Sequence, residues 1–375
     1  MSRKKRIIIL GLGDSGVLVA QGLARDCDVT VITPRPYFLS SQNVGGRLAW
    51  PSAWERIAKI GVSQFKRLDD VDIVQGLATG IDLAKSEVTS RTGEGDLRTD
   101  GYDALVIATG TENGFWRKTR LESWEQEAGR RAEERAALND ARTIAIIGGG
   151  ASGVSLAASL AERYPDRSVR LYHSGERPLP NYPNRVGQKI SNQLQSLGVE
   201  ILSGYRAKIP DISQRIRIGP EIVEWTTGQP PTKADCVIWA IGNPKPNSGF
   251  LPAEILTEDE FVRVEPTLQV EGQRTVFCVG DLAATDQHRC SARNGGADIV
   301  VTNIKSALDL SNKPLKHFRA PKYKWGEVVT SPSVGMTLFT PGGKRVQMPD
   351  WFVQSVIFNL ILFKCIYGGV RKPRR

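Results

Sequence analysis

The chain has 375 residues, a formal net charge of +10, and 40% hydrophobic and 24% charged residues, which is typical of a globular protein of two or three domains. Five cysteines without a close pair and three histidines argue against a disulfide framework and a zinc cluster, so no metal site is predicted. The excess of positive charge is compatible with nucleic acid, an anionic membrane or phosphate-bearing cofactors as partners.

The first predicted element is a buried strand, Ile7–Leu10, which runs directly into a glycine-rich turn and an apolar helix over 17–23. The turn has the spacing Gly-x-Gly-x-x-Gly, which lets backbone approach a pyrophosphate, while the helix N-terminus offers N–H groups and partial positive charge. An ordinary tight strand-helix turn is the alternative. The residues predicted to bind a dinucleotide here are Gly11, Gly13, Asp14, Ser15 and Gly16.

A second strand, Asp28–Thr33, should end at the same cofactor. Dinucleotide folds usually place an acid there to hold ribose hydroxyls, whereas this chain has Thr33 followed by Pro34 and Arg35. We expect an irregular stretch over 37–54, because two prolines precede it. Two further strands are predicted near 71–76 and 87–91.

The next buried strand, over 102–107, ends in Ala108, Thr109 and Gly110, small residues that let backbone pass close to a cofactor. A plain core strand with a small-residue end is the alternative. Residues 112–141 are polar, and the dense Glu and Arg predict a linker and a solvated helix with i,i+4 charge pairs. No role at an active site is indicated for this helix.

A second glycine-rich unit follows the strand Thr143–Ile147, and two such units in one chain suggest two dinucleotides. Its next strand ends at His173, a position where an acid would favour NAD by holding the ribose 2′-hydroxyl. His173 together with Arg177 would instead tolerate the 2′-phosphate of NADP. The nearby Glu176 points back to NADH. A surface histidine without a role is the alternative for His173. The residues predicted to bind the second dinucleotide are Gly148, Gly150, Ala151, Ser152, Gly153, His173 and Gly242.

Between His173 and Gly242 the pattern predicts a helix over 184–197, a strand over 199–202 and short strands near 215–218 and 222–226. The apolar strand that ends at Gly242 resembles the one that ends at Gly110, so the chain is expected to return to the first unit after it.

The strand over 275–279 ends in Gly280 and Asp281. An aspartate there can accept hydrogen bonds from a ribityl chain, and Gly280 permits a close approach; an Asp that caps the next helix is the alternative. A small-residue helix is predicted over 292–308, and its N-terminus would place positive potential beside a flavin.

The C-terminal region combines a predicted hairpin, 334–339 with 344–348, and an almost wholly apolar helix, Trp351–Tyr367. This helix is short for a bilayer span, and basic residues follow it, which suits contact with an anionic membrane surface. A helix buried against the chain's own core, or against a second copy in a homodimer, is the alternative.

Five segments in this order resemble the FAD- and NAD(P)H-dependent oxidoreductases with two dinucleotide-binding domains: GLGDSG, YDALVIATGT, IAIIGGGASGV, CVIWAIGNPKPN and TVFCVGDLAA. The chain looks most like the apoptosis-inducing-factor-like branch with ferroptosis suppressor protein, and like type II NADH:quinone oxidoreductases. The resemblance implies an α/β fold with two Rossmann-like domains. These two would be an FAD-binding domain (1–111 and 238–315) and an NAD(P)H-binding domain (112–237), and a small C-terminal domain (316–375) would follow them.

The resemblance also implies that hydride passes from NAD(P)H to FAD and that the flavin then reduces a quinone; the flavin itself is the reactive group, and no residue is assigned as a general acid or base. A reductase of a ferredoxin-like protein or of O₂ is one alternative, and a basic flavoprotein that binds nucleic acid is another. Nucleic acid is not expected as a partner, because no array of aromatic and basic residues is present. The expected location is cytoplasmic and peripheral on the inner face of a membrane.

Overall fold

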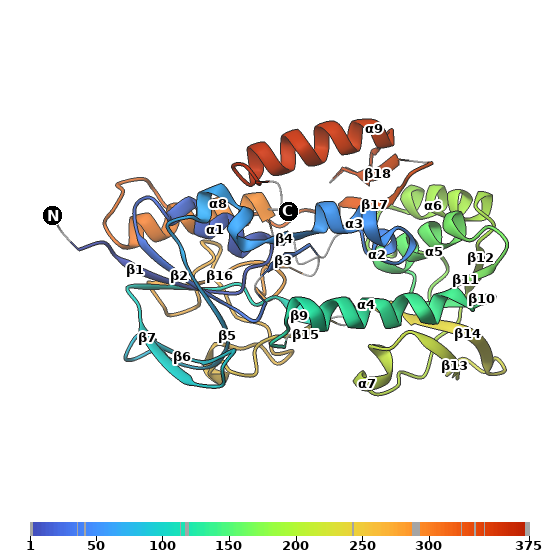
Figure 1. Ribbon diagram of the computed structural model, residues 1–375, viewed down its shortest axis with the longest axis horizontal. Helices are drawn as coiled ribbons and strands as arrows, with labels where there is room; N and C mark the ends of the chain where they lie inside the picture. The colour runs from blue at the N-terminus through green and yellow to red at the C-terminus, as the bar shows by residue number, and fades with distance from the viewer. Residues whose placement is uncertain are drawn as a thin grey trace.

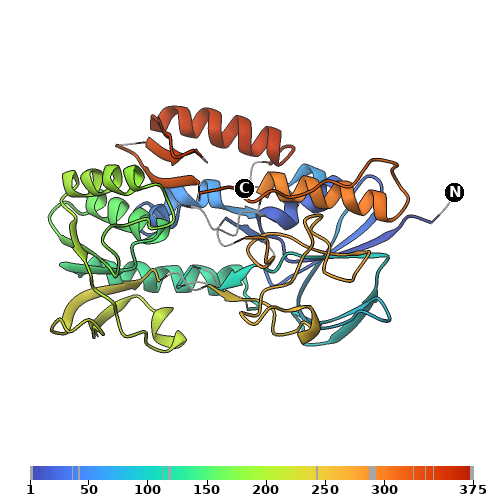
Figure 2. The same cartoon turned by 180° about the vertical axis from the view of Figure 1, so that it is seen from behind.

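A computed structural model of the chain shows two lobes side by side, each built on a sheet (Figure 1). Helix α4 (Trp124–Asn139) runs along one side of them, and the C-terminal helix crosses the opposite side, as Figure 2 shows from behind. Apart from the side chains at 212–213 and 293–294, the structure describes residues 3–35, 37–40, 43–112, 114–116, 120–241, 244–286, 293–323, 325–333, 335–340 and 342–371.

The first lobe contains a seven-stranded sheet in the spatial order β16-β8-β1-β2-β5-β6-β7. The first five of these strands are parallel, and β6 and β7 are antiparallel additions. Ile9 lies opposite both Val31 and Val106, and all three are fully buried, which explains why these strands are apolar runs. The strands are β1 (Arg6–Leu10), β2 (Asp28–Thr33), β5 (Asp72–Asp82), β6 (Glu87–Thr92), β7 (Leu97–Gly101), β8 (Ala104–Ile107) and β16 (Val276–Cys278).

Helices α1 (Asp14–Leu23) and α8 (Arg293–Ala307) cover one face of this sheet. They touch closely, because a Cβ on Gly22 would lie 2.7 Å from the side chain of Val301. The segment with the short helix η3 (Ala253–Ile255) packs apolar side chains on the other face. The sheet is therefore covered on both sides, as a parallel sheet requires.

The second lobe contains a five-stranded sheet in the order β12-β11-β10-β14-β13, of which only the edge strand β13 is antiparallel. Helices α5 (Ala151–Arg163) and α6 (Asn184–Ser196) pack on one face. On the other face Tyr172 and Trp225 stack with ring centroids 4.8 Å apart. The strands are β10 (Thr143–Ile147), β11 (Ser168–His173), β12 (Glu200–Ser203), β13 (Gly219–Val223) and β14 (Thr232–Trp239). Two lobes of this kind confirm the expected α/β fold class.

The expected strand near 215–218 is wrong. A one-turn helix, α7 (Ile212–Arg215), occupies the start of this stretch, and β13 begins at Gly219. The alternation of Ile216 and Ile218 has the period of a strand, but Ile212 and Ile216 are four residues apart, which fits a helical turn.

The chain passes between the lobes twice, and the two passages pair as the short antiparallel strands β9 (Thr111–Glu112) and β15 (Lys245–Pro246). This pairing places the start of the second lobe beside the return to the first. It also carries the residues that follow β8 and β14 to the junction of the lobes.

The expectation of an irregular stretch over 37–54 is also wrong. Two short antiparallel strands enclose two helices, and 3₁₀ turns follow: β3 (Tyr37–Leu39), α2 (Val44–Ala49), α3 (Pro51–Ala58), β4 (Lys59–Gly61), η1 (Val62–Gln64) and η2 (Lys66–Leu68). Asn43 caps α2 by accepting a hydrogen bond from the Gly46 N–H, and Pro51 begins α3. Gly45 lets α2 lie directly on α5, because a Cβ there would collide with the Ser155 carbonyl.

Helix α4 forms with most of its residues exposed and with the predicted i,i+4 charge pairs, Glu127 with Arg131 and Arg130 with Glu134, but one side of it is buried. Glu127 and Glu134 are buried on it and pair with cations from the 37–61 segment: Glu127 lies 2.5 Å from the Lys59 ammonium, and Glu134 lies 2.9 Å from the Arg47 guanidinium. The carboxylates that face inward therefore fix α4 against α2 and β4, which sequence periodicity does not reveal.

The C-terminal region contains the predicted hairpin and one strand more, as the antiparallel sheet β17 (Gly326–Ser331), β18 (Gly335–Phe339) and β19 (Arg345–Met348). Val328, Val329 and Phe339 join the core of the second lobe. The expected apolar helix forms as α9 (Asp350–Phe352) followed by the π-helical segment η4 (Val353–Ile366). In the described part of the chain, no helix combines the length and apolar character needed to cross a membrane.

Candidate functional site

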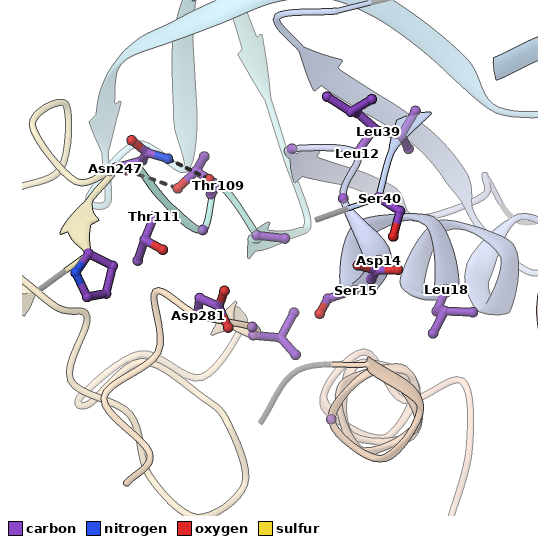
Figure 3. A pocket seen from close by; sticks show the side chains of 18 of the residues that line it. Leu12, Asp14, Ser15, Leu18, Leu39, Ser40, Thr109, Thr111, Asn247 and Asp281 are labelled. Atoms are coloured by element: carbon purple, nitrogen blue, oxygen red, sulfur yellow. Dashed lines mark hydrogen bonds between the residues drawn. The ribbon is translucent and has the colours of Figure 1, made fainter. Parts of the chain in front are cut away.

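The ends of the parallel strands in both lobes open into one cavity of about 1020 Å³. Both glycine-rich turns contribute to its wall, the first through residues 11–15 and the second through residues 150–152. Figure 3 shows this cavity from close by, with Asp14 and Ser15 on one side and Thr109, Asn247 and Asp281 across from them. The two motifs that lie far apart in sequence thus face the same space.

The first turn has the conformation that its glycines predict. Gly11 has a φ of +99°, and a Cβ on it would lie 2.6 Å from the Ala108 carbonyl oxygen. A Cβ on Gly16 would collide with the Gly11 carbonyl, so this glycine packs helix against turn. Gly13 is different, because a Cβ there would meet no atom within 4 Å. The backbone at Gly13 is therefore open to the cavity, at the N-terminus of α1.

The residues predicted at three other strand ends also line this cavity. Listed along the chain, they are Thr33, Pro34 and Arg35 after β2, Ala108, Thr109 and Gly110 after β8, and Gly280 and Asp281 after β16. Gly280 has a φ of +88°, which allows the sharp turn at the end of β16. These segments come together because the carboxyl ends of parallel strands meet at one edge of a sheet.

Asn247 is a residue of this wall that the sequence pattern does not single out. Its side-chain amide donates to the Thr109 carbonyl at 2.9 Å, and the Thr109 hydroxyl donates to the Asn247 carbonyl at 3.0 Å (Figure 3). This reciprocal pair fixes the turn after β8 against the passage that returns from the second lobe. The only signal in the sequence is the position of Asn247 just after two prolines.

Charged groups gather near the end of β2, where Arg35 is partly buried and desolvation lowers the pKa of its guanidinium. Nearby, burial alone would raise the pKa of Glu122, but hydrogen bonds from Arg130 and Arg120 outweigh it and lower this pKa to about 2. The Tyr37 hydroxyl donates to Glu122 at 3.2 Å, and burial together with that carboxylate raises the pKa of the phenol. Tyr37 therefore stays protonated and Glu122 ionised.

The second turn repeats the geometry of the first. Gly148 has a φ of +127°, and a Cβ on it would collide with the Ala240 carbonyl. Gly153 packs against the Gly148 carbonyl in the same way, while a Cβ on Gly150 would meet no atom within 4 Å. Gly150, Ala151 and Ser152 line the cavity, whereas Gly148 and Gly153 shape the turn from behind. The predicted contact at Gly242 lies outside the described residues.

His173 does not line the cavity but lies buried behind the second turn, 4% exposed. Its Nε2 is 3.2 Å from the Ser203 hydroxyl. Its Cβ lies so close to Gly149 that a Cβ added to this glycine would be only 2.7 Å away. Burial lowers the pKa of the imidazole, partly opposed by a backbone contact with Gly175. This side chain is therefore neutral near pH 7.

The C-terminal region supplies a wall that sequence reasoning missed. Apolar and aromatic side chains from the linker after α8 and from η4 line the cavity: Phe318, Pro321, Trp325, Leu362, Ile366 and Tyr367. Trp116 and Tyr182 add aromatic surface from the second lobe. The wall next to the first turn is thus largely apolar, and no motif marks it because its residues come from four separate segments.

The described cysteines are free and do not line the cavity. Burial raises the pKa of Cys236 to about 12, and it raises that of Cys278 as well, which keeps both as thiols. Cys290 lies outside the described residues. Among the described residues, no group of three metal-binding side chains gathers at one place.

Comparison with known proteins connects this geometry to a family. The sequence model of one family, pyridine nucleotide-disulphide oxidoreductase, matches residues 5–307. Apoptosis-inducing factor homolog B of Dictyostelium discoideum is 26% identical over 98% of this chain and 95% of its own length. The type II NADH:quinone oxidoreductase Ndh of Mycobacterium tuberculosis is 26% identical over 84% of this chain and 76% of its own length. The crystal structure of a covalent putidaredoxin reductase–putidaredoxin complex superposes with a TM-score of 0.64 at 20% identity, covering 90% of this chain and 82% of that one.

Proposed function

Because the chain belongs to the pyridine nucleotide-disulphide oxidoreductase family, we propose that it is an NAD(P)H:quinone oxidoreductase that works through bound FAD. Its cofactors are FAD and NAD(P)H. The observation that carries the proposal is that both glycine-rich turns open into one cavity, each through a glycine with free space beside it, Gly13 and Gly150. A pyrophosphate fits these positions, because backbone N–H groups at a helix N-terminus face the space that a side chain would fill.

In this proposal FAD lies against the first turn. Gly11, Gly13 and Gly16 form the turn, and the Thr33 hydroxyl with the Arg35 guanidinium takes the place of the acid that usually holds the ribose. The end of β8 and the Gly280–Asp281 turn would hold the ribityl side, since Asp281 offers oxygens that accept hydrogen bonds. When bound, FAD accepts a hydride and passes electrons to the acceptor. The chain's own residues orient the two rings and exclude water.

NAD(P)H would lie against the second turn, with its nicotinamide pointing to the shared cavity. The proposed domains are 1–111 with 238–315 for FAD, 112–237 for NAD(P)H, and 316–375 as a C-terminal domain. The wall formed by Phe318, Trp325 and Tyr367 would then face the flavin, where a flat apolar acceptor could approach.

A quinone is the acceptor that this wall favours. The surface of this wall is apolar and aromatic, and the described thiols, of which Cys27, Cys236 and Cys278 are buried and Cys365 is exposed, do not line the cavity. A relative named as a type II NADH:quinone oxidoreductase, 26% identical, supports the same acceptor. Reduction of O₂ would appear instead as oxidation of NADH in air without added quinone, and reduction of an iron–sulfur protein as turnover only when such a protein is added.

We further propose that the protein is peripheral to a membrane. One side of the C-terminal helix is buried through Val353 and Phe358, but the other leaves Trp351, Leu360 and Ile361 exposed by 68%, 46% and 40%. Exposed apolar residues on a helix suit insertion into the surface of a bilayer, where quinones with long tails dissolve.

Two matched substitutions test the assignment of the two turns. Gly13→Val and Gly150→Val each add a side chain to a backbone with negative φ and open space, so both variants should fold. We expect Gly13→Val to be purified without flavin. Gly150→Val should keep its flavin but lose reduction by NADH by at least about a hundredfold, because the side chain fills the pyrophosphate position.

Gly80→Val, in β5 and also without neighbours, is the control and should behave as the wild type. Absorbance of the purified proteins and the rate of anaerobic reduction give both readouts. If Gly150→Val is still reduced at the wild-type rate, the second turn does not bind the nicotinamide nucleotide. If Gly13→Val retains its flavin, FAD does not lie at the first glycine-rich turn.

A further inference from the structure

The residue that caps the end of the C-terminal helix segment, Tyr367, is fixed against the first lobe. Tyr367 is buried, and its ring packs edge-on against Phe38 and Phe65, with centroids 5.6 Å and 5.4 Å away. The side-chain amide of Gln21 in α1 donates to the Tyr367 carbonyl at 3.0 Å. Because ring and backbone are both held, the position of the phenol oxygen is set by the fold.

That oxygen meets a residue of the first glycine-rich turn. The Tyr367 hydroxyl donates a hydrogen bond of 2.9 Å to Oδ1 of Asp14, the first residue of α1. Both side chains line the cavity, and Figure 3 shows Asp14 at the start of α1 beside Ser15. The C-terminal helix and the turn that faces a pyrophosphate are therefore joined by one hydrogen bond between residues 353 positions apart.

Asp14 is an unusual neighbour for a pyrophosphate. A carboxylate in the first turn of a helix is attracted by the same N–H groups and partial positive charge that bind phosphate oxygens. If it turned toward those groups, it would compete with the pyrophosphate for them and repel its negative charge. A partner that holds the carboxylate to one side removes this competition.

We propose that Tyr367 is a positioning residue that holds the Asp14 carboxylate away from the pyrophosphate of FAD, and that the C-terminal helix thereby controls how tightly FAD is retained. The proposal rests on the proposed binding of FAD at the first turn. Tyr367 acts through Asp14 and takes no part in the transfer of hydride. The alternative is that Tyr367 only packs against Phe38 and Phe65, in which case its hydroxyl has no effect on FAD.

Rates of FAD release from the purified holoprotein separate these two roles, because free flavin fluoresces more strongly than bound flavin. Tyr367→Phe keeps the ring and removes the hydroxyl, so it should release FAD about tenfold faster than the wild type. Asp14→Asn removes the charge, so it should release FAD no faster than the wild type. The decisive variant combines both substitutions, and it should release FAD as slowly as Asp14→Asn alone.

The control is Asp69→Asn, which breaks the exposed pair between Asp69 and Arg371 on the same tail without touching the cavity. Its FAD release should equal that of the wild type. The proposal is overturned if Tyr367→Phe releases FAD at the wild-type rate, or if the double variant is as fast as Tyr367→Phe. A wild-type protein that binds no FAD at all would instead contradict the proposed function on which the inference rests.

Discussion

The residues after β11 bear on the choice between NADH and NADPH. Arg177 could hold a 2′-phosphate, but its guanidinium already donates to the Leu179 carbonyl at 3.0 Å, the Tyr182 carbonyl at 3.3 Å and Asn184 Oδ1 at 2.6 Å. His173 is neutral because burial lowers its pKa, and the exposed Glu176 adds negative charge. Within residues 173–177, all of them described, no cation is left over for a 2′-phosphate.

We therefore predict that NADH reduces the flavin at least about tenfold faster than NADPH does at equal subsaturating concentration, a difference of about 1.4 kcal/mol. Ser174 is exposed at this strand end, so Ser174→Arg should narrow the ratio by offering a free guanidinium. Ser168→Arg, at the opposite end of β11, is the matched control and should leave the ratio unchanged. Equal rates for both nucleotides in the wild type would show that this strand end does not select between them.

Burial of His173 also predicts a pH dependence of stability. Its pKa in the folded protein lies below the value of about 6.5 expected in the unfolded chain, so below that pH the unfolded state binds more protons. Stability from this group is present above about pH 6.5 and is lost as the pH falls. We expect the urea concentration at the midpoint of unfolding to fall less for His173→Asn than for the wild type when the pH is lowered from 7.5 to 5.5. Equal falls of the urea midpoint in both proteins would mean that His173 contributes nothing to the pH dependence of stability.

At the scale of elements, the strands and glycine-rich turns were predictable because their information is local. An apolar run that ends in Gly-x-Gly-x-x-Gly specifies strand, turn and helix within about 20 residues, as in β1 and α1. The helices of the 37–61 segment and the buried side of α4 were not predictable in this way. Their stability comes from pairs such as Arg47 with Glu134, which are 87 positions apart in sequence.

The α4 pairs make a prediction about stability. Arg47 and Glu134 are both buried and linked by a salt bridge of 2.9 Å, while Arg130 pairs with Glu134 at 2.8 Å, so removing Arg47 takes one of two cations from a buried carboxylate. Arg47→Met should lower the free energy of unfolding by about 1.5–3 kcal/mol, the range for a hydrogen bond to a charged group, whereas Arg47→Met with Glu134→Leu should cost less, because the buried carboxylate is gone as well. Denaturant unfolding of both variants measures this. A double variant that is less stable than Arg47→Met would show that Glu134 depends mainly on Arg130.

At the scale of the whole molecule, the C-terminal region takes part in two surfaces. Its inner side closes the cavity through Leu362, Ile366 and Tyr367, and its outer side exposes Trp351, Leu360 and Ile361. The sequence alone left open whether this helix meets lipid, a second copy or its own core. Contact with the first lobe buries only one side of the C-terminal helix.

We predict that the protein sediments with anionic vesicles and that salt releases only part of it, because apolar insertion survives screening. Leu360→Ser with Ile361→Ser should abolish sedimentation without a cost in stability, since both side chains are exposed. Leu97→Ser, which removes a still more exposed apolar residue from β7, is the control and should sediment normally. A wild type that stays in the supernatant at low salt would assign the exposed side of the helix to a second copy instead.

The central claim is that one cavity brings FAD and a nicotinamide together and delivers electrons to a quinone, and anaerobic titration of the purified protein tests it most directly. The account predicts a yellow protein whose flavin absorbance is bleached by about one equivalent of NADH and restored by a water-soluble quinone. A protein that takes up no FAD, or a bound flavin that neither NADH nor NADPH bleaches, would contradict it.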